Sequence, residues 1–354
     1  MAAELTKELR SKPVSVWRII GKILFRTFLV LFTTVLLLVD GIIGLVYTFN
    51  YGPSPSARSL FVTSVLETSA LDFLATRFLP SEEIETILAT NAVEHFDIVS
   101  NPNLIVIPER SETNESTEEK AIEVVAVSGL TYSGRMMIVK DPSRVFVGTC
   151  SSLGDPEGTG EKIQAIANRY DAIAGINGGG FYDPKGVGSG SIPTGFVFSG
   201  GEFLYGPTDK SDLIIGFDKE NRLIVGTMTA NEAQALGIRD ALTFGPALII
   251  NGEPANISGS SSGLNPRTAI GQRADGAVLL LVIDGRQAES LGASYADLIE
   301  VMQSFGAINA ANLDGGSSSI MLYNDEIISN KSGIIGNRRM PTCFLVERRA
   351  TDEE

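Results

Sequence analysis

The sequence contains one histidine and two cysteines among its 354 residues. A serine-histidine-aspartate triad and a zinc site with several histidines both need histidine at the reaction centre. The single histidine, His95, precedes the region that carries the motifs described below, where we expect it to be a surface or packing residue. The cysteines, Cys150 and Cys343, could form one disulfide or remain buried free thiols, and the sequence does not decide between these. We therefore expect any catalysis to rely on carboxylates.

Basic residues are also scarce. The chain has 28 lysines and arginines against 42 aspartates and glutamates, which gives a formal net charge of −14. Nucleic-acid binding depends on basic side chains that displace counterions from the phosphate backbone, so no nucleic-acid partner is expected. The apolar share of 44% and the charged share of 20% exclude a disordered chain and indicate a folded protein.

A long apolar run covers residues 27–49 and includes one charged residue, Asp40. As a helix that rises about 1.5 Å per residue, this run would cross a hydrocarbon core of roughly 30 Å. The preceding residues 1–26 are rich in lysine and arginine, which predicts a cytoplasmic N-terminus and an extracellular remainder. We expect a single-pass signal anchor. A cleaved signal peptide is the alternative, although its apolar region is usually only about 7–15 residues long.

The chain after the apolar run divides into two regions of different composition. Helical patterns are expected over 59–78 and from Ser81, which is a candidate N-cap. Residues 109–120 have no large apolar side chain and five glutamates, which is typical of a linker. The expected organisation is a basic cytoplasmic tail (1–26), a transmembrane signal anchor (27–49), a spacer with a helical stalk or cap and an acidic linker (50–118), and the main domain (119–350).

Short β-branched runs that end in glycine, aspartate or asparagine begin near residue 121 and predict strands joined by turns. Helical patterns between them are fewer, at 160–169, 231–236 and 295–305. The last is the clearest, because Ser294 and Asp297 have the spacing of a capping box. The sequence therefore predicts an α+β fold with a large mixed β-sheet core and flanking helices.

Two Asp-Gly pairs follow predicted strands on either side of the helix at 295–305. The order strand, helix, strand over 277–322 favours parallel strands, which would bring Asp284 and Asp314 to the same sheet edge. If the strands are direct neighbours, they lie about 4.8 Å apart. Two carboxylates so placed can act as general acid and general base, or as nucleophile and general acid, in a reaction at the anomeric carbon of a sugar. The alternative is that each pair is only a turn.

Glycine-rich segments supply a second candidate element. The segments at 177–181 (NGGGF) and 315–319 (GGSSS) each follow a predicted strand, and their backbone N–H groups could converge on an anion. Arg267 is the cation that we place beside such an anion, with a surface salt bridge as the alternative. Asp183 could join the two aspartates around calcium or magnesium, but no fixed ligand spacing supports this and we expect no cofactor.

Four segments together resemble the phosphodiester glycosidase family, which includes bacterial proteins associated with exopolysaccharide and the cell envelope. They are NGGGFYDPKG (177–186), NPRTAIG (265–271), LLLVIDGRQAESLGAS (279–294) and the run 298–321, and they occur in one order within about residues 120–348. The resemblance implies a hydrolase that cleaves the C1–O bond of a sugar-1-phosphodiester. Its substrate would be a small glycosyl phosphodiester or a glycan such as an exopolysaccharide or a teichoic-acid-like polymer.

The resemblance also implies the site residues. Asp314 and Asp284 would be the catalytic carboxylates, one as nucleophile or base and the other as its partner. The implied substrate and phosphate ligands are Asn177, Gly178, Gly179, Arg267, Thr268, Gly285, Arg286, Gly315, Gly316 and Ser317. Ser317 stands where many relatives carry a third glycine. Two other functions stay open, a non-catalytic module that binds envelope glycans or polyanions and a metal-dependent phosphodiesterase that cuts the P–O bond.

Overall fold

The computed structural model divides the chain into two compact units, Met1–Pro53 and Ser54–Glu354. It describes residues 16–68, 71–94, 96, 98–108, 121–183, 190–259, 262–330 and 338–349. The expectations for His95, for the basic tail up to residue 15 and for the acidic linker at 109–120 lie outside these described residues.

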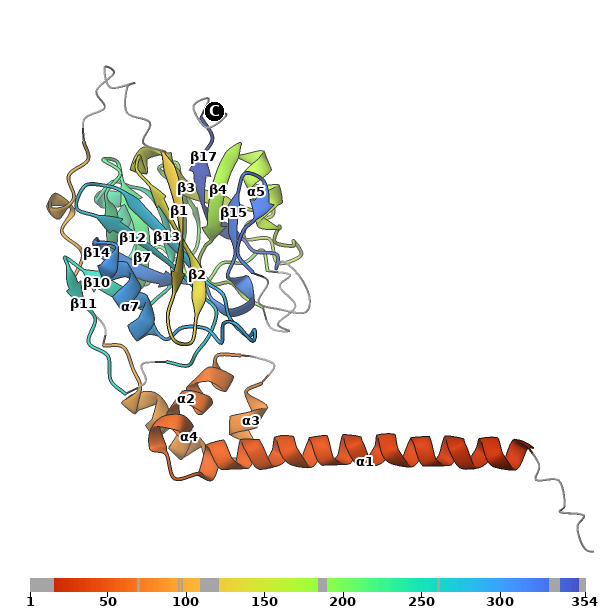
Figure 1. Cartoon of the computed structure of the whole chain (residues 1–354). Coiled ribbons are helices and arrows are strands. Elements are labelled where there is room, and N and C mark those ends of the chain that lie inside the picture. Colours follow the sequence, from red (N-terminus) through yellow and green to blue (C-terminus); the bar gives the residue numbers. More distant parts are fainter. Residues whose placement is uncertain are drawn as a thin grey trace, which may run out of the picture. The chain divides into compact units, whose positions relative to one another are not determined.

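The first unit contains helix α1 (Val16–Tyr51), which is longer than the predicted apolar run (Figure 1). Its length and composition are sufficient to cross a membrane, and a signal sequence near an N-terminus would have the same properties. Large apolar side chains such as Leu37 and Leu24 are more than half exposed along it. The helix is therefore a candidate anchor or signal segment.

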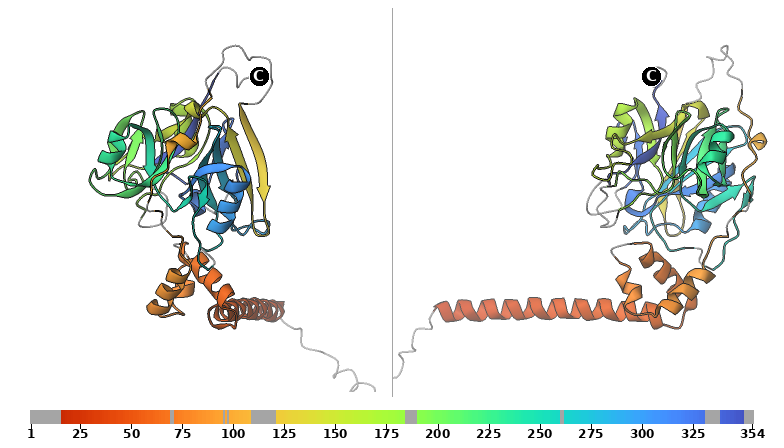
Figure 2. Two further views of the ribbon diagram at one scale, coloured as in Figure 1. Left: turned by 90° about the vertical axis from the view of Figure 1, so that its left-hand side faces the viewer. Right: turned by 180° about the vertical axis from the view of Figure 1, so that it is seen from behind.

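The second unit begins with three short helices, α2 (Pro55–Leu66), α3 (Phe73–Thr76) and α4 (Ser81–Thr90), at one end of the sheets (Figure 2). The single helix predicted over 59–78 is wrong, because α2 ends at Leu66 and α3 starts only at Phe73. Ser81 is the first helical residue of α4 and Pro80 takes the N-cap position, so the predicted N-cap is also wrong. The three helices pack around a small apolar cluster.

Three β-sheets follow. The seven-stranded sheet has the order β1 (Ile122–Ser128), β2 (Ser133–Val139), β13 (Val278–Ile283), β12 (Arg267–Arg273), β14 (Ala307–Leu313), β10 (Ala247–Ile250) and β11 (Glu253–Pro254). A five-stranded sheet has the order β16 (Glu326–Ile327), β15 (Met321–Tyr323), β4 (Ala172–Asn177), β17 (Thr342–Glu347) and β3 (Val145–Thr149). The other five-stranded sheet has the order β6 (Glu202–Tyr205), β5 (Val197–Ser199), β9 (Ile238–Thr243), β7 (Asp212–Asp218) and β8 (Leu223–Met228).

The predicted α+β class is confirmed, with the strands divided among three sheets whose described ladders are antiparallel. Side chains from all three sheets meet in one buried core that includes Leu280, Phe344 and Phe217. Helices α5 (Ile163–Arg169), α6 (Ala230–Ala235) and α7 (Tyr295–Ser304) flank the sheets, together with 3-10 turns at Pro102–Leu104, Pro142–Arg144 and Gly316–Ser318.

Helix α7 confirms the clearest local prediction. The Ser294 hydroxyl accepts from the Asp297 backbone N–H at 3.3 Å, and the Asp297 carboxylate accepts from the Ser294 backbone N–H at 2.7 Å. Gly306 follows the helix with φ 82°, a conformation that favours glycine at a helix end. The buried face of α7 packs in one cluster with Leu281 and Ala310 of the seven-stranded sheet. These contacts fix the strand-helix-strand unit β13-α7-β14.

Strands β13 and β14 run parallel, but the expectation that they could be direct neighbours is wrong. Strand β12 lies between them and pairs antiparallel with both, so Thr268 is opposite Val282 on one side and Leu313 on the other. Two sheet spacings of about 4.8 Å then separate β13 from β14 by roughly 10 Å. The sequence pattern of a buried strand does not encode which strands pair with it, and for this reason the inserted strand was missed.

The two cysteines are both buried and free. They lie in one apolar cluster with Ile166 and Leu345, and burial raises the pKa of the Cys343 thiol. The structure thus corresponds to the alternative in which the cysteines act as small apolar residues.

Candidate active site

Three of the predicted site residues meet at one edge of the seven-stranded sheet. Asp284 follows the last residue of β13, Asp314 follows the last residue of β14, and Arg267 is the first residue of β12. Because β12 runs antiparallel between the other two strands, its beginning lies beside both of their ends. The sheet topology therefore places one cation between the ends of the two strands that carry the aspartates.

The carboxyl group of Asp314 has a pKa above its ordinary value. Burial raises its pKa from 3.8 to about 6, although hydrogen bonds from the Ser318 side chain and the Gly315 backbone oppose the shift. The Gly315 N–H lies 3.0 Å from the carboxylate, and the Asp314 backbone N–H donates to the carbonyl of Gly178 at 3.1 Å. A carboxyl group with a pKa close to the working pH is suited to acid-base or nucleophilic chemistry.

Asp284 has a different environment. Its two carboxylate oxygens accept hydrogen bonds from the backbone N–H of Asn330 at 2.8 Å and from the Asn330 side chain at 3.0 Å. The residue is only 5% exposed, and burial raises its pKa against the effects of Asn330 and Arg135. Both oxygens are thus used to hold the segment after β16, so the geometry favours a positioning role for Asp284.

Asn177, at the end of β4, joins three segments of the site. Its side-chain N–H donates to the carbonyl of Asp314 at 2.6 Å, and its side-chain oxygen accepts from the Thr268 hydroxyl at 2.7 Å and the Ile320 backbone N–H at 3.1 Å. Asn177 and Thr268 are both buried. These bonds support the turn at Asp314, whereas the role of Asn177 and Thr268 as substrate ligands stays a prediction.

We expect the Asn177→Ala variant to lose about 1–3 kcal/mol of the free energy of unfolding, because the Thr268 hydroxyl and the Ile320 N–H would be left buried without their acceptor. Denaturant unfolding of the purified chain measures this. The matched control is Asn168→Ala, at an exposed position of α5, which should change the value by less than about 0.5 kcal/mol. Equal stabilities of the two variants would contradict this supporting role.

The glycines of the two predicted anion loops are needed for close packing. A Cβ on Gly178 would lie 2.6 Å from the Thr342 hydroxyl oxygen, and one on Gly179 would lie 2.6 Å from the carbonyl of Thr243. Beside β12, a Cβ on Gly285 or Gly315 would lie 2.8 or 2.9 Å from backbone atoms of Pro266. The role of these glycines as anion ligands stays a prediction, whereas their steric role is evident.

Arg267 is buried, which excludes the surface salt bridge considered above. One of its terminal nitrogens lies 2.7 Å from the Glu67 carboxylate and 2.9 Å from both the Ser262 hydroxyl and the Gly263 carbonyl. Its Nε donates to the carbonyl of Ala293 at 3.1 Å, and the guanidinium lies 4.2 Å from the ring centre of Tyr295. Arg267 is 4% exposed.

Arg286 is the more accessible of the two predicted arginines. Its guanidinium donates to the Thr68 hydroxyl at 2.8 Å and to the side-chain oxygen of Asn265 at 3.2 Å. A Cβ on Gly316, whose φ is 60°, would lie 3.3 Å from an Arg286 terminal nitrogen. Arg286 therefore lies against the turn that follows Asp314, where it could face an anion.

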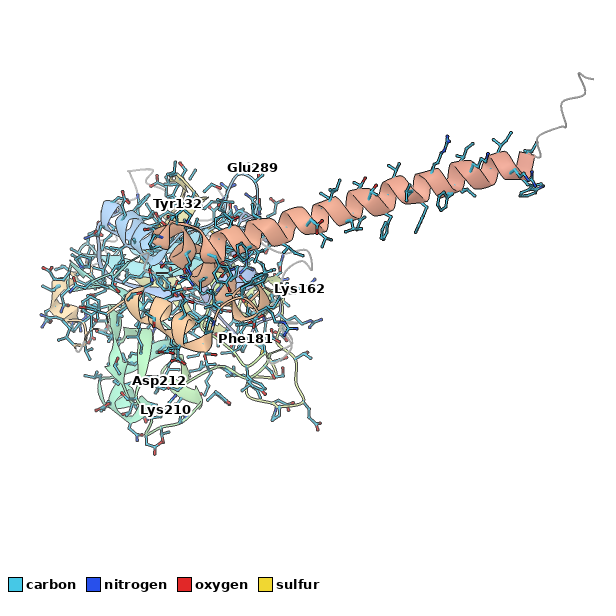
Figure 3. The ribbon with its side chains drawn as sticks, turned by 90° about the horizontal axis from the view of Figure 1, so that it is seen from below. Tyr132, Lys162, Phe181, Lys210, Asp212 and Glu289 are labelled. Carbon is cyan, nitrogen blue, oxygen red and sulfur yellow. The ribbon has the colours of Figure 1, made fainter. Side chains whose placement is uncertain are left out.

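A third arginine of the site, Arg338, was missed by the sequence analysis. It donates to the hydroxyls of Ser317 and Ser318 at 3.2 and 3.3 Å, pairs with Asp183, and lies 5.0 Å from the ring centre of Phe181, which Figure 3 labels. The position of Arg338 in the sequence, relative to the other motifs, did not indicate that it would contact them. Among the residues that the structure describes, no three histidine, cysteine, aspartate or glutamate side chains are grouped to hold a metal ion.

Glu67, at the end of α2, was also missed. Its carboxylate lies 2.7 Å from both Arg267 and the side-chain nitrogen of Asn265, and the adjacent Thr68 contacts Arg286. Burial raises the pKa of Glu67 although Arg267 lowers it. A carboxylate from the helical segment α2–α4 thus lies among the arginines of the site, Arg267 and Arg286. Nothing in the neighbouring sequence distinguishes Glu67 from other glutamates.

Comparison with known proteins gave matches to a protein family, to a bacterial protein and to solved structures. The family model described as phosphodiester glycosidase matches residues 170–347. The SPbeta prophage-derived uncharacterized protein YomE of Bacillus subtilis is 27% identical over 198 residues, which are 54% of this chain and 29% of that protein, so the chain spans less than a third of its length.

One similar solved structure is the zebrafish N-acetylglucosamine-1-phosphodiester alpha-N-acetylglucosaminidase catalytic domain, auto-inhibited by its pro-peptide. It is similar with a TM-score of 0.55 and 20% identity, and the match covers 66% of this chain and 86% of that chain. At this level of identity the match shows a shared fold.

Proposed function

Because the chain belongs to the phosphodiester glycosidase family, we propose that it hydrolyses the bond between C1 of a sugar and the oxygen of a phosphodiester. The oxygen of water becomes bonded to C1, the C1–O bond breaks, and the departing phosphate keeps the electron pair. The products are a free sugar and a phosphate monoester on the acceptor. The observation that supports this most directly is Asp314, a carboxyl group with a pKa of about 6 at the same sheet edge as Arg267 and Arg286.

In this proposal Asp314 acts as nucleophile or base at C1. A phosphate monoester is a good leaving group that needs little protonation, so cations that stabilise its charge are sufficient to assist departure. Arg286 lies against the turn after Asp314 and is the residue that we assign to this task, with Arg267 beside it. Asp284 keeps the segment at Asn330 in place and so acts as a positioning residue for the site.

The Glu67 contact supports a regulatory element. Its carboxylate pairs with Arg267 and also interacts electrostatically with Arg286, the cation assigned to the substrate phosphate. The zebrafish enzyme is auto-inhibited by its pro-peptide. We assign a comparable restraint to the helical segment α2–α4 of this chain. In this arrangement the arginines become available to a substrate phosphate only when Glu67 moves away from them.

The apolar helix α1 supports a location at a membrane. In this proposal it is a signal anchor with a cytoplasmic N-terminus, and the glycosidase domain acts outside the cell on an envelope glycan, an exopolysaccharide or a teichoic-acid-like polymer. Protease digestion of intact and of permeabilised cells tests the orientation, since an extracellular domain is degraded in both.

The experiment that tests the reaction uses the full chain in detergent with an α-N-acetylglucosamine-1-phosphodiester. Free sugar and sugar phosphate are quantified separately, with and without a chelator. Free sugar that is unchanged by the chelator is the expected result. Sugar phosphate that disappears on chelation would replace the proposal with a metal-dependent phosphodiesterase, and saturable binding without any product would replace it with a binding module.

A further inference from the structure

Arg338 has no role in the reaction proposed above, although it contacts the turn that follows Asp314. One of its terminal nitrogens donates to the hydroxyl of Ser317 at 3.2 Å and to the hydroxyl of Ser318 at 3.3 Å. These serines end the 3-10 turn Gly316–Ser318, which begins two residues after Asp314. A cation that contacts this turn can act on the reacting carboxylate.

Ser318 connects Arg338 to Asp314. Its hydroxyl donates to the Asp314 carboxylate and lowers the pKa of that group, against the effect of burial. Ser318 is 1% exposed, and its backbone N–H donates to the carbonyl of Gly315 at 3.1 Å. The hydrogen bonds that the described part of the chain gives to the Asp314 carboxylate come from Ser318 and from the Gly315 N–H. Ser318 is therefore the side chain through which the charge of Asp314 is stabilised.

The hydroxyl of Ser318 has a single hydrogen, and Arg338 determines where that hydrogen points. A guanidinium can only donate, so the Ser318 oxygen is the acceptor in its contact with Arg338. The hydroxyl hydrogen is then left for the Asp314 carboxylate. Hydrogen bonds that are joined in this way strengthen one another, and bonds to charged groups are the stronger ones. The order Arg338, Ser318, Asp314 thus favours the ionised carboxylate, which is the form that a nucleophile or base requires.

Contacts with other segments hold Arg338 in this position. Its second terminal nitrogen pairs with Asp183, whose side chain is only 7% exposed. The guanidinium lies 5.0 Å from the ring centre of Phe181. Two residues later, the backbone of Met340 exchanges hydrogen bonds of 2.8 and 3.0 Å with that of Glu161. A guanidinium fixed from several sides is preorganised, because its geometry does not have to form during the reaction.

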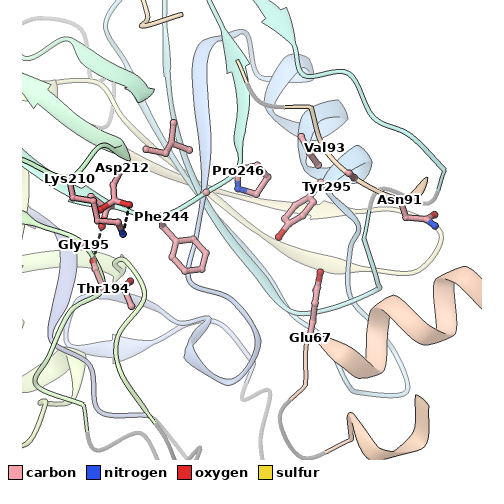
Figure 4. Close-up of a pocket in the computed structure, with 14 residues that line it drawn as sticks. Glu67, Asn91, Val93, Thr194, Gly195, Lys210, Asp212, Phe244, Pro246 and Tyr295 are labelled. Carbon is pink, nitrogen blue, oxygen red and sulfur yellow. Dashed lines mark hydrogen bonds and ion pairs between the residues drawn. The ribbon is translucent and has the colours of Figure 1, made fainter. Parts of the chain in front are cut away.

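The cleft beside the sheet edge involves Arg267 rather than Asp314. Figure 4 shows Glu67 and Tyr295 facing each other at one end of this cleft, whose volume is about 610 Å³. Arg267 contacts both of them, through an ion pair of 2.7 Å with Glu67 and a distance of 4.2 Å to the ring centre of Tyr295. Asp314 and Ser318 are not among the described residues that line the cleft. The environment of the Asp314 carboxylate is therefore set by the turn that follows it.

The other charged groups approach this turn from different sides. A Cβ on Gly316 would lie 3.3 Å from a terminal nitrogen of Arg286, and a Cβ on Gly315 would lie 4.0 Å from the Cδ of Arg267. The charged groups around the turn are Arg286, Arg267 with its partner Glu67, Arg338 with its partner Asp183, and Asp284 at the same sheet edge. Of the three arginines, Arg338 is the one whose described contacts include a side chain that donates to Asp314.

We propose that Arg338 is a positioning residue for the reaction, which fixes the Ser318 hydroxyl so that this group donates to Asp314, while Asp183 holds the guanidinium in place. The inference rests on the proposed function, which makes Asp314 the reacting carboxylate. It goes beyond that function because it assigns roles to three residues that do not touch the substrate.

The first measurement follows the ionisation of Asp314 without any turnover. A water-soluble carbodiimide couples an amine to protonated carboxyl groups, and peptide mass spectrometry of the full chain in detergent gives the labelled fraction of Asp314 at each pH. The midpoint of labelling is expected near pH 6 in the unmodified chain. It should lie about one pH unit higher in Arg338→Gln and in Ser318→Ala, the scale of one lost hydrogen bond to a charged group.

The second measurement is the rate of sugar release by the same variants. At pH 6 kcat/KM should fall about fivefold, because the ionised share of Asp314 falls from roughly one half to roughly one tenth. The loss should largely disappear at pH 8, where the carboxyl group is ionised in each variant. KM should stay unchanged, since Arg338 acts through Ser318 and not on the substrate.

The matched control is Arg339→Gln, because Arg339 is the next residue, is exposed, and donates to the carbonyl of Gly160 at 3.3 Å instead. It should leave the labelling midpoint and KM unchanged. A raised KM in Arg338→Gln with an unmoved midpoint would overturn the positioning role and make Arg338 a ligand of the substrate phosphate.

Ser318→Ala removes only one oxygen atom, so it tests the proposal even if Arg338→Gln does not fold, which a thermal unfolding curve shows. An unmoved midpoint in Ser318→Ala would overturn the proposal while leaving the glycosidase in place. A midpoint that rises in the variants, without any sugar release by the unmodified chain, would keep the arrangement of Arg338, Ser318 and Asp314 and overturn the reaction.

Discussion

The Asp314→Asn variant is expected to lose roughly a hundred- to ten-thousand-fold of kcat, the range for removing an acid-base group. The amide cannot ionise, so it can neither attack C1 nor accept a proton from water. It still offers an oxygen to the Gly315 N–H and the Ser318 side chain, so the fold should be retained. Initial rates of sugar release and a thermal unfolding curve together separate lost chemistry from lost structure.

The pH profile of the unmodified chain checks the same assignment. Burial places the pKa of Asp314 at about 6, above its usual 3.8, so the ionised form that a nucleophile or base requires is gained as the pH rises through 6. kcat/KM should therefore increase across that range. A rate that falls instead would make Asp314 a general acid, and full activity of Asp314→Asn would remove it from the mechanism. Asp325→Asn, at an exposed turn, is the control.

Glu67→Gln is expected to lower KM for the phosphodiester by about tenfold or more. Glu67 pairs with Arg267 and interacts electrostatically with Arg286, so its charge offsets the cations that would stabilise the substrate phosphate. A hydrogen bond to a charged group contributes roughly 1.5–3 kcal/mol, of which the neutral amide keeps only a part. Removing the carboxylate should free the arginine without changing the reacting groups, so kcat should stay the same or rise. Steady-state kinetics of the full chain measures both constants.

Glu83→Gln is the matched control, because Glu83 pairs with Arg58 within the same helical segment and does not contact the site arginines. It should leave KM unchanged. A lower kcat in Glu67→Gln, with KM unaltered, would contradict the restraint and would place Glu67 among the catalytic carboxylates. The Glu67→Ala variant, which removes the side-chain oxygens altogether, should lower KM further if the restraint is correct.

Several features of the site could be predicted from the sequence because they depend on neighbouring residues. The capping box of α7 is formed by side chains three positions apart, and the glycine after it ends the helix. The Asp-Gly pairs at Asp284 and Asp314 do follow strands, because the apolar runs before them are long enough to define those strands. Motif order was likewise sufficient to predict the family, which the match over 170–347 confirms.

Other features depend on which distant segments pack together. Strand β12 lies between β13 and β14, and no pattern within any of the three strands specifies that order. Asp284 is held by Asn330, 46 positions later, and Arg267 is paired with Glu67, 200 positions earlier. The sequence therefore predicted both carboxylates and the arginine, but it did not predict that each has a different partner.

The sequence by itself determined the composition, the apolar helix, the α+β class and the motifs of a phosphodiester glycosidase, since these follow from local periodicity, capping and turn chemistry. The tertiary structure decided the environment of each site residue. Burial raised the pKa of Asp314, the sheet order placed Arg267 between two strand ends, and the helical segment brought Glu67 to the arginines. Desolvation and ion pairing are properties of the packed chain, and local sequence does not record them.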